Sequence, residues 1–200
     1  MELSTNFYEN NCNKFSDTRF CLWDVVRDFG KQFKKDSYVL DAGCGNGKNI
    51  YYFQNISNII GIDKCVGLVN ICKNKGYNVN EGNIQSIKYS DNTFDFVMCV
   101  AVIHHLDSEE LRKQSIKEML RVLKPGGKLL VTSWAYECDE YSKRKKFNIG
   151  DNYVKFNSDE ILRYYYIYDK IGFENLCKNV SNNVEITWDR GNWNAIFTKK

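Results

Sequence analysis

Short apolar runs alternate with segments of helical periodicity along most of the chain. Strands are expected over residues 38–41, 58–63, 77–81 and 94–102. Helices are expected from the end of the first glycine-rich loop to about Phe53 and over 66–75. The run 94–102 is almost entirely apolar, as in a strand buried on both faces of a sheet. Strands and helices alternating in this way predict a parallel sheet covered by helices on both faces.

The next helix has recognisable ends. Asp107 is a suitable N-cap, and Glu110 three residues later completes the pattern of a capping box. Apolar residues then recur at helical spacing up to Leu123. The helix is expected to stop at the segment 124–127, Lys-Pro-Gly-Gly, and the run 128–134 predicts another strand.

Beyond Trp134 the alternation weakens. Residues 135–157 are polar, basic and irregular, and a helix is expected over 158–166. Two strand-like stretches, 173–180 and 192–198, with the connection 181–191, predict a terminal antiparallel hairpin. The first 35 residues have helical character, and their apolar side chains could pack on the sheet or cover a site.

Composition narrows the class of protein. A chain of 200 residues with 43% hydrophobic residues predicts one globular domain. Neither a long apolar run nor an apolar N-terminal core is visible, so we expect a cytoplasmic protein. The eight cysteines are scattered without the spacing of a zinc or redox motif, which favours free thiols and no metal.

The charge of the chain does not by itself identify a binding partner. The net charge of +3 is too small to indicate nucleic-acid binding. The one concentrated basic run is 143–146, Lys-Arg-Lys-Lys. Such a run is usually a solvated loop, although it could also contact phosphates.

The segment 41–47, Asp-Ala-Gly-Cys-Gly-Asn-Gly, follows the first expected strand. In open α/β sheets a ligand binds beyond the carboxyl ends of the strands, where the strand order reverses. The glycines allow a tight turn and close backbone approach to a ligand. Lys48 stands where the dinucleotide fingerprint needs its last glycine, and Asn49 follows it where a phosphate-binding P-loop needs Ser or Thr.

Further motifs follow this loop in order. Asp63 ends the second expected strand, where a carboxylate can accept hydrogen bonds from ribose hydroxyls, and Asn83 follows the third. Phe-Asp-Phe-Val opens the fourth strand at 94–97, and Leu-Lys-Pro-Gly-Gly occupies 123–127. Together these motifs resemble class I S-adenosylmethionine-dependent methyltransferases over about residues 37–134.

The resemblance implies a Rossmann-like α/β fold. This fold has a mostly parallel seven-stranded sheet with helices on both faces and the terminal antiparallel hairpin. It implies one domain over 1–200, with a helical cap at 1–36, a cofactor-binding core at 37–134 and a substrate-side region at 135–200. S-adenosylmethionine is the implied cofactor. The expected cofactor-binding residues are Asp41, Gly43, Cys44, Gly45, Asp63, Lys64, Asn83, Ile84 and Val100.

A closer resemblance extends over nearly the whole chain. Ser16-Asp17-Thr18-Arg19, Val102-Ile103-His104-His105 and Arg163-Tyr164-Tyr165 are its most specific segments. They resemble the eukaryotic tRNA wobble-uridine carboxymethyl methyltransferases. That family methylates the carboxylate of 5-carboxymethyluridine in tRNA. A carboxylate is already ionised at neutral pH, so the chemistry needs positioning rather than a general base.

Arg19, His104 and His105 are the catalytic candidates. Arg19 could dock the substrate carboxylate, or else bind the carboxylate of the cofactor or a surface acid. His104 could hydrogen-bond the uracil or the substrate carboxylate, and His105 could brace the loop. A purely structural histidine is the simpler alternative for either.

The resemblance also implies a partner. The family works with a small zinc-binding activator subunit, which pairs through an added strand, so a heterodimer is expected. The segments around Ile59-Ile60 and Tyr77-Val79 are where we expect it. Two alternatives stay open: a small-molecule O-methyltransferase, and a catalytically silent binding subunit with the same fold.

Overall fold

A computed structural model describes residues 8–9, 11–14, 16, 21–137, 147–155 and 162–200. Its main sheet has seven strands in the order β3-β2-β1-β4-β5-β9-β8, and a two-stranded sheet pairs β6 with β7. The strands are β1 Tyr38–Ala42, β2 Asn58–Asp63, β3 Val79–Glu81, β4 Phe94–Val100, β5 Leu123–Trp134, β6 Gly150–Lys155, β7 Leu162–Ile167, β8 Val184–Asp189 and β9 Asn192–Thr198.

The first five strands are parallel, and β9 pairs antiparallel with both β5 and β8. The helices are α2 Asp24–Gly30, α3 Lys48–Phe53, α4 Val66–Asn74, α5 Glu109–Val122 and α6 Lys170–Lys178, with a 3-10 turn, η1, at Ile103–His105. The predicted fold class, a mostly parallel seven-stranded sheet with a terminal hairpin, is confirmed.

The central strands contribute to a hydrophobic core on each face. Successive side chains of a strand point to opposite faces. Accordingly, Val39 packs in one core while Leu40 packs in the other, and Val97 and Met98 divide in the same way. All four side chains are fully buried. This double burial explains why these strands are largely apolar rather than alternating regularly with polar residues.

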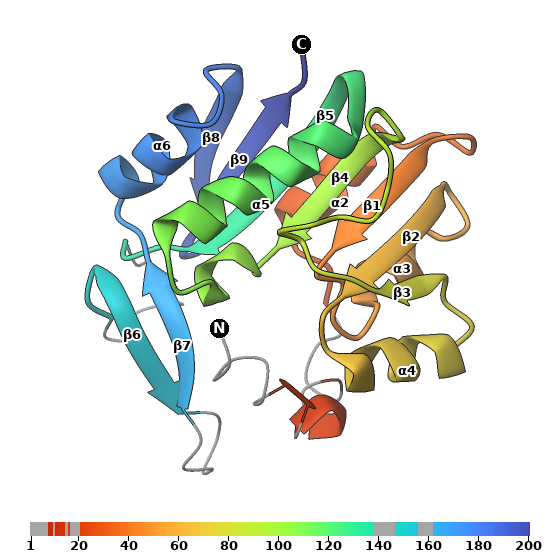
Figure 1. Cartoon of the computed structure of the whole chain (residues 1–200), viewed down its shortest axis with the longest axis horizontal. Coiled ribbons are helices and arrows are strands. Elements are labelled where there is room, and N and C mark those ends of the chain that lie inside the picture. Colours follow the sequence, from red (N-terminus) through yellow and green to blue (C-terminus); the bar gives the residue numbers. More distant parts are fainter. Residues whose placement is uncertain (1–7, 10, 15, 17–20, 138–146, 156–161) are drawn as a thin grey trace.

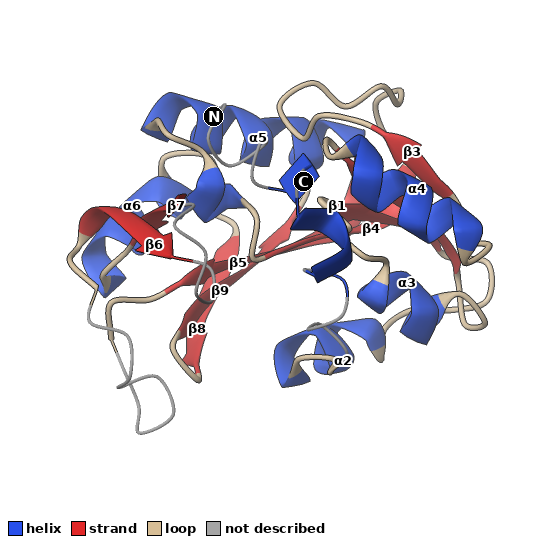
Figure 2. Ribbon diagram, turned by 90° about the horizontal axis from the view of Figure 1, so that it is seen from below, coloured by secondary structure: helices blue, strands red, loops and turns tan. Residues whose placement is uncertain are grey.

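Helices cover both faces (Figure 2). The core that contains Leu40 is completed by apolar residues of α5 and α6. The opposite core is completed by α2, α3 and α4. An aromatic cluster anchors α2 there, where the ring of Phe29 lies 5.7 Å from that of Phe33 and 5.8 Å from that of Phe96.

The parallel strands all end at one edge of the sheet. There the strand order reverses between β1 and β4, because the chain moves outward through β2 and β3 and then returns to the other side of β1. The helical residues near the N-terminus and the β6–β7 pair lie beyond this edge (Figure 1). They lie where a ligand is expected in an open α/β sheet.

The strands and helices expected between residues 38 and 134 are present, but several predictions for the remainder were wrong. The predicted helix over 158–166 is wrong where the structure describes it, because residues 162–167 form β7. Runs of tyrosine with isoleucine favour an extended chain. The region 135–157 is not irregular throughout, since it contains β6.

The predicted strand over 173–180 is also wrong, because residues 173–178 belong to α6. Asp169 caps the helix by accepting a hydrogen bond from Gly172 N at 2.8 Å. Phe173, Leu176 and Cys177 are buried on one face at the three- and four-residue spacing of a helix.

The terminal hairpin exists, but its first strand is β8 rather than 173–180. Arg190 and Gly191, which join β8 to β9, have φ angles of 45° and 75°. Two consecutive left-handed residues are typical of the tight turn that suits the twist of antiparallel strands. The connection is therefore two residues long rather than the expected 181–191.

The N-cap of α5 is Ser108, not Asp107. The Ser108 hydroxyl accepts a hydrogen bond from Leu111 N at 3.2 Å. Glu109 and Glu110 fill the first turn, where negative charge is favourable near the helix N-terminus. The capping box predicted from Asp107 and Glu110 is wrong because the helix begins one residue later.

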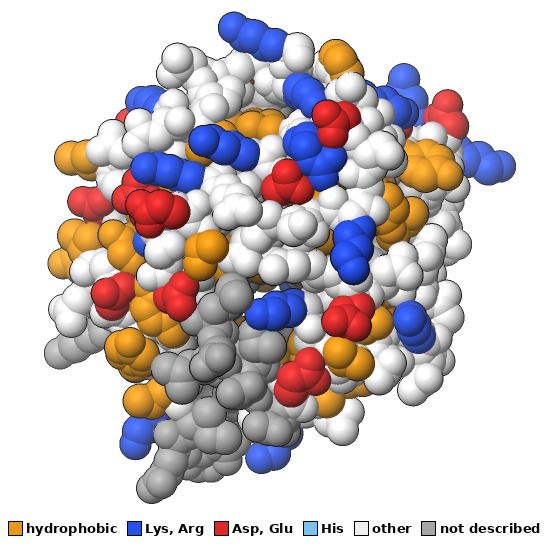
Figure 3. All heavy atoms as spheres, viewed as in Figure 1, with side chains coloured by type: hydrophobic (Ala, Val, Ile, Leu, Met, Phe, Trp, Pro, Cys, Tyr) orange, Lys and Arg blue, Asp and Glu red, His pale blue; other side chains and the backbone are white. Residues whose placement is uncertain are grey.

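No helix in the described residues is long and apolar enough to cross a membrane. On the face seen in Figure 3, lysine and arginine side chains are interspersed with acidic ones rather than gathered by sign. The basic run 143–146 lies outside the described residues.

We expect Ser108→Ala to lower the free energy of unfolding by about 1 kcal/mol, because Leu111 N loses its acceptor. Ser108→Asp should retain the stability, since a carboxylate accepts the same bond and suits the helix N-terminus. Chemical denaturation of the three proteins measures this. Equal stability of the alanine and aspartate variants would contradict the assignment of the cap.

Candidate active site

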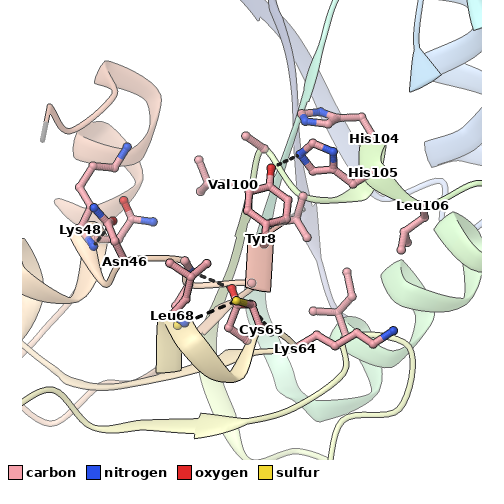
Figure 4. A pocket seen from close by; sticks show the side chains of 18 of the residues that line it. Tyr8, Asn46, Lys48, Lys64, Cys65, Leu68, Val100, His104, His105 and Leu106 are labelled. Carbon is pink, nitrogen blue, oxygen red and sulfur yellow. Dashed lines mark hydrogen bonds between the residues drawn. The ribbon is translucent and has the colours of Figure 1, made fainter. Parts of the chain in front are cut away.

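A cavity of about 500 Å³ opens at the point where the strand order reverses. It lies within the size range of ligand pockets in proteins. One half is formed by the carboxyl ends of β1 to β4, and the other by η1, Trp134 and β7. In Figure 4, Asn46 and Lys48 lie on one side, His104 and His105 on another, and Tyr8 points between them toward His105.

The glycine-rich loop brings bare backbone to the cavity. Gly43 and Gly45 line it, with φ angles of 80° and 56°. A Cβ atom on Gly43 would meet Val102 Cγ2 at 2.5 Å. Glycine is therefore needed at position 43 for two reasons. The backbone there is left-handed, and the loops after β1 and β4 approach each other closely.

Asp63 joins this loop to the start of α4. One carboxylate oxygen accepts a hydrogen bond from Gly45 N at 2.8 Å, and the other accepts one from Cys65 N at 2.9 Å. Burial raises the pKa of the Asp63 carboxyl, while these bonds oppose the rise. Each oxygen retains acceptor capacity, so the side chain can still bind hydroxyl groups in the cavity.

Asp41 lies behind the loop rather than in the cavity wall. Its side chain is completely buried and is absent from the residues that line the cavity. Asn49 Nδ2 donates to its two oxygens at 3.3 and 3.2 Å. Burial raises the pKa of Asp41 to about 7, against the effect of this amide. The geometry suits a residue that supports the loop.

The other predicted cofactor residues line the cavity: Gly43, Cys44, Gly45, Asp63, Lys64, Asn83, Ile84 and Val100. Asn83 has an ordered side chain, because its Oδ1 accepts from Gln85 N and its Nδ2 donates to Gln85 Oε1, both at 3.0 Å. Its oxygen keeps a second lone pair toward a ligand amine. The roles of these eight residues in cofactor binding remain predictions.

The second half of the cavity is aromatic. Trp134 and Tyr165 stack with their rings 4.2 Å apart and an angle of 11° between planes. Both imidazoles pack near this stack, with His104 5.2 Å and His105 4.5 Å from the Tyr165 ring. Flat apolar walls of this kind suit a planar group such as a nucleobase.

His105 is held at both ring nitrogens. Nδ1 lies 3.0 Å from the carbonyl oxygen of Tyr164, which can only accept, so Nδ1 carries the proton. Nε2 therefore accepts from the hydroxyl of Tyr8 at 3.0 Å. Burial lowers the pKa of His105 to about 4, and the charge of Arg163 contributes. The side chain is neutral at physiological pH.

His104 is almost fully buried beneath the cavity. Its Nδ1 accepts a hydrogen bond from Trp134 N at 3.2 Å, so the neutral ring carries its proton on Nε2. His104 thereby connects η1 to the end of β5 and fixes the aromatic wall.

Several lining residues were not among the predicted site residues, and they include Tyr8, Trp134, Arg163 and Tyr165 of the aromatic half. Arg163 and Tyr165 were placed on a helix, where they would not share a face. On β7 they lie two residues apart, so both point to the face that lines the cavity. The strand propensity of the tyrosine run was the signal that could have revealed them. Arg19 lies outside the described residues. No group of three or more metal-ligating side chains is present in the described part of the chain.

Sequence comparisons identify relatives. Residues 40–131 match a family described as "Methyltransferase domain". The tRNA (carboxymethyluridine(34)-5-O)-methyltransferase of Schizosaccharomyces pombe is 33% identical over 218 residues, covering 96% of this chain and 94% of that protein. A protein of Encephalitozoon cuniculi named as a methyltransferase is 36% identical over 86% of this chain and 82% of its own. Some relatives are longer: this chain spans 37% of the Arabidopsis thaliana protein that shares the S. pombe name, at 40% identity over 74% of this chain.

Solved structures share the fold. A methyltransferase from Methanosarcina mazei superposes with a TM-score of 0.70 at 19% identity, over 89% of this chain and 98% of that one. A Haloferax volcanii methyltransferase, solved in complex with the Trm112 activator, gives 0.66 at 11% identity, over 98% and 97%.

Fold and site together define a class I methyltransferase, for which S-adenosylmethionine is the cofactor. Within that class, the extent of identity to the S. pombe protein assigns the chain to the family of tRNA (carboxymethyluridine(34)-5-O)-methyltransferases. The residues present fit the cofactor. The cavity offers bare backbone at Gly43 and Gly45, acceptors for ribose hydroxyls at Asp63, and Asn83 beside it. When bound, S-adenosylmethionine supplies a methyl group on a positively charged sulfur.

We expect Gly43→Ala to abolish cofactor binding and to destabilise the protein by more than Gly76→Ala. Both glycines have φ near 80°, but a Cβ on Gly76 meets nothing within 4 Å. Gly76→Ala should therefore show the left-handed cost alone, about 1–2 kcal/mol. Thermal unfolding and calorimetric titration with S-adenosylmethionine measure both effects, and equal losses in the two variants would contradict the packing argument.

His105 should titrate near pH 4, measured from its ring nitrogen shifts by NMR. Because this pKa is lowered, the folded state binds fewer protons than the unfolded state below about pH 6.5. The free energy of unfolding should therefore fall as the pH drops from about 6.5 to 4. His105→Gln should make this slope shallower, and Tyr8→Phe should raise the pKa. A native pKa of 6.5 or above would contradict this reading.

Proposed function

We propose that this protein methylates the carboxylate of 5-carboxymethyluridine at the wobble position of tRNA. One observation carries the proposal. A cofactor half and an aromatic half meet in one cavity, in a chain that aligns over almost its full length with a relative of that name. The aromatic half has the shape for a base that has left the anticodon stack.

The chemistry agrees with the protonation of the site. A carboxylate nucleophile is ionised at neutral pH, so it needs no base. His105 is neutral, and both its nitrogens are engaged by Tyr8 and Tyr164. We therefore assign His104 and His105 to positioning the aromatic wall and a bound uracil, with catalysis by orientation. Arg19 remains a candidate for contact with the substrate or cofactor carboxylate.

Recognition of tRNA would combine this domain with a partner. We propose a single domain over 1–200, with the helical N-terminal region as the cap, in a cytoplasmic heterodimer with a small zinc-binding activator. β3 is an edge strand of the sheet, which supports the expected position of the partner near Tyr77–Val79. Ile59 is buried, so this part of the expected surface is less suitable. The basic run 143–146 could contact phosphates.

The first experiment uses S-adenosylmethionine carrying a labelled methyl group. The RNA is tRNA with 5-carboxymethyluridine at the wobble position, with and without a Trm112-type activator. We expect base-labile label on the wobble nucleoside. Asp63→Ala should reduce labelling at least 100-fold together with cofactor affinity, because the acceptors for the ribose hydroxyls are lost. Arg19→Ala tests the remaining candidate.

The matched control is tRNA with unmodified wobble uridine, which should take no label. Cofactor binding without labelling of the modified tRNA, even with the activator, would contradict the proposal and favour a small-molecule O-methyltransferase. A chain that fails to bind the cofactor at all would favour a silent binding subunit.

A further inference from the structure

Two adjacent residues near the N-terminus, Tyr8 and Glu9, contact opposite halves of the cavity. The hydroxyl of Tyr8 donates to Nε2 of His105 at 3.0 Å, in the aromatic half. The Glu9 carboxylate reaches the start of α4 in the cofactor half. There Oε1 accepts from Val66 N at 2.6 Å and Oε2 accepts from Gly67 N at 3.1 Å. Because Tyr8 and Glu9 share a peptide bond, the position of one side chain restricts the position of the other.

The attachment of Glu9 to α4 is strong. Its two oxygens accept from N–H groups of the first helical turn, which have no acceptor within the helix. Such bonds to an ionised acceptor are stronger than neutral ones, and negative charge is favourable at a helix N-terminus. After burial, the charge of Glu9 contributes to the raised pKa of the nearby Asp63 carboxyl. Glu9 thus holds the N-terminal residues beside the carboxylate of the cofactor half.

A second contact at the same place depends on a glycine. A Cβ atom on Gly67 would meet Sγ of Cys12 at 2.9 Å and Oε2 of Glu9 at 3.4 Å. The φ angle of Gly67 is not in the left-handed region, so the helix itself does not require glycine there. Alanine favours a helix more than glycine does. Gly67 therefore serves the close packing of the N-terminal residues against α4.

Tyr8 is the member of the pair that reaches the aromatic half. It lines the cavity and points toward His105 (Figure 4), with the two ring centres 5.6 Å apart in an edge-on arrangement. His105 in turn lies 4.5 Å from the Tyr165 ring of the aromatic wall. A shift of Tyr8 would move part of the cavity lining and release the nitrogen that holds His105 in place.

We propose that Glu9 is a positioning residue of the methyltransferase site. By binding the first turn of α4, it holds Tyr8 against His105 and so fixes the aromatic half relative to the cofactor half. Methyl transfer requires the acceptor atom in line with the sulfur–methyl bond, so the two halves must keep a fixed relation. Glu9 is not part of the cavity lining, and it therefore acts through Tyr8. It has this role whichever acceptor occupies the aromatic half.

The alternative is that Glu9 only stabilises α4. Its removal would then lower the free energy of unfolding, while the hydrogen bond between Tyr8 and His105 would persist. The signal of His105 Nε2 separates the two roles, because only a positioning residue alters it from a distance. The chain has two histidines, so His104 provides an internal reference.

The test records the ring nitrogen signals of both histidines by NMR, in the whole chain at neutral pH. The variants are Tyr8→Phe, Glu9→Ala, the double variant of these two, and Gly67→Ala. Asp169→Ala is the matched control. Asp169 also caps a helix through its carboxylate, but at α6, and it is not part of the cavity lining.

We expect Tyr8→Phe to move the Nε2 signal of His105, because that nitrogen loses its donor, and Glu9→Ala to move it in the same direction. The double variant should match the single variants, since both residues act through one contact. Gly67→Ala should also move the signal, although alanine favours the helix. Asp169→Ala should lower the stability and leave the signal unchanged.

Methyl transfer is measured in the same variants with labelled S-adenosylmethionine and the modified tRNA. The value of kcat/KM should fall about tenfold in Tyr8→Phe and in Glu9→Ala, without a further fall in the double variant. Glu9→Gln should retain part of the activity, because its amide oxygen can still accept one of the two bonds.

An unmoved His105 signal in Glu9→Ala and Gly67→Ala, or effects that add in the double variant, would overturn the role of Glu9. So would an unmoved signal in Tyr8→Phe, or unchanged methyl transfer in Glu9→Ala. Should Glu9→Ala not fold, Glu9→Gln and Gly67→Ala decide the matter. If the wild-type protein methylates no tRNA, the proposed function fails, whereas the His105 signal still confirms or overturns the positioning of Tyr8 by Glu9.

Discussion

The bonds between the Asp63 carboxylate and the backbone at Gly45 and Cys65 hold the cofactor half of the site together. They connect the loop after β1 with the turn from β2 into α4 across the sheet edge. A partly buried carboxylate needs such partners, because an unpaired charge there would be costly. The same side chain faces the cavity, so the group that fixes the loop is also available to a ligand.

The aromatic half is fixed by a different means. His104 and His105 lie on a short turn after β4, and their hydrogen bonds reach β5, β7 and the N-terminal segment. Because each imidazole is neutral and anchored, the histidines act as spacers between secondary-structure elements. The cavity thereby gains a rigid, low-dielectric wall in which Arg163 is the buried positive charge. Positioning and electrostatics, rather than proton transfer, are what this half can offer.

Elements whose formation depends on the residues within them were easier to predict than elements that depend on contacts with distant parts of the chain. β1 and β4 were predictable because burial on both faces demands a largely apolar run. α6 was mistaken for a strand because Phe173, Leu176 and Cys177 form a short stripe whose helical period shows only once the partner surface is known. Residues 162–167 were mistaken for a helix, since their strand depends on pairing with β6. The N-cap of α5 was predicted one residue too early. Asp107 and Ser108 are both suitable capping residues, and the sequence does not show which of two neighbours caps the helix.

The sequence by itself determined the parallel strands of the sheet, the glycine-rich loop and most of the cofactor half, because those residues follow strand ends in chain order and backbone geometry restricts them. It also determined that His104 and His105 adjoin the site. Only the tertiary structure decided that Asp41 supports the loop from behind and that Tyr8 reaches His105, 97 positions along the chain. It alone placed Arg163 and Tyr165 in the cavity. Contacts between distant segments depend on how β7 and the N-terminus fold back over the sheet edge, and no local pattern carries that information.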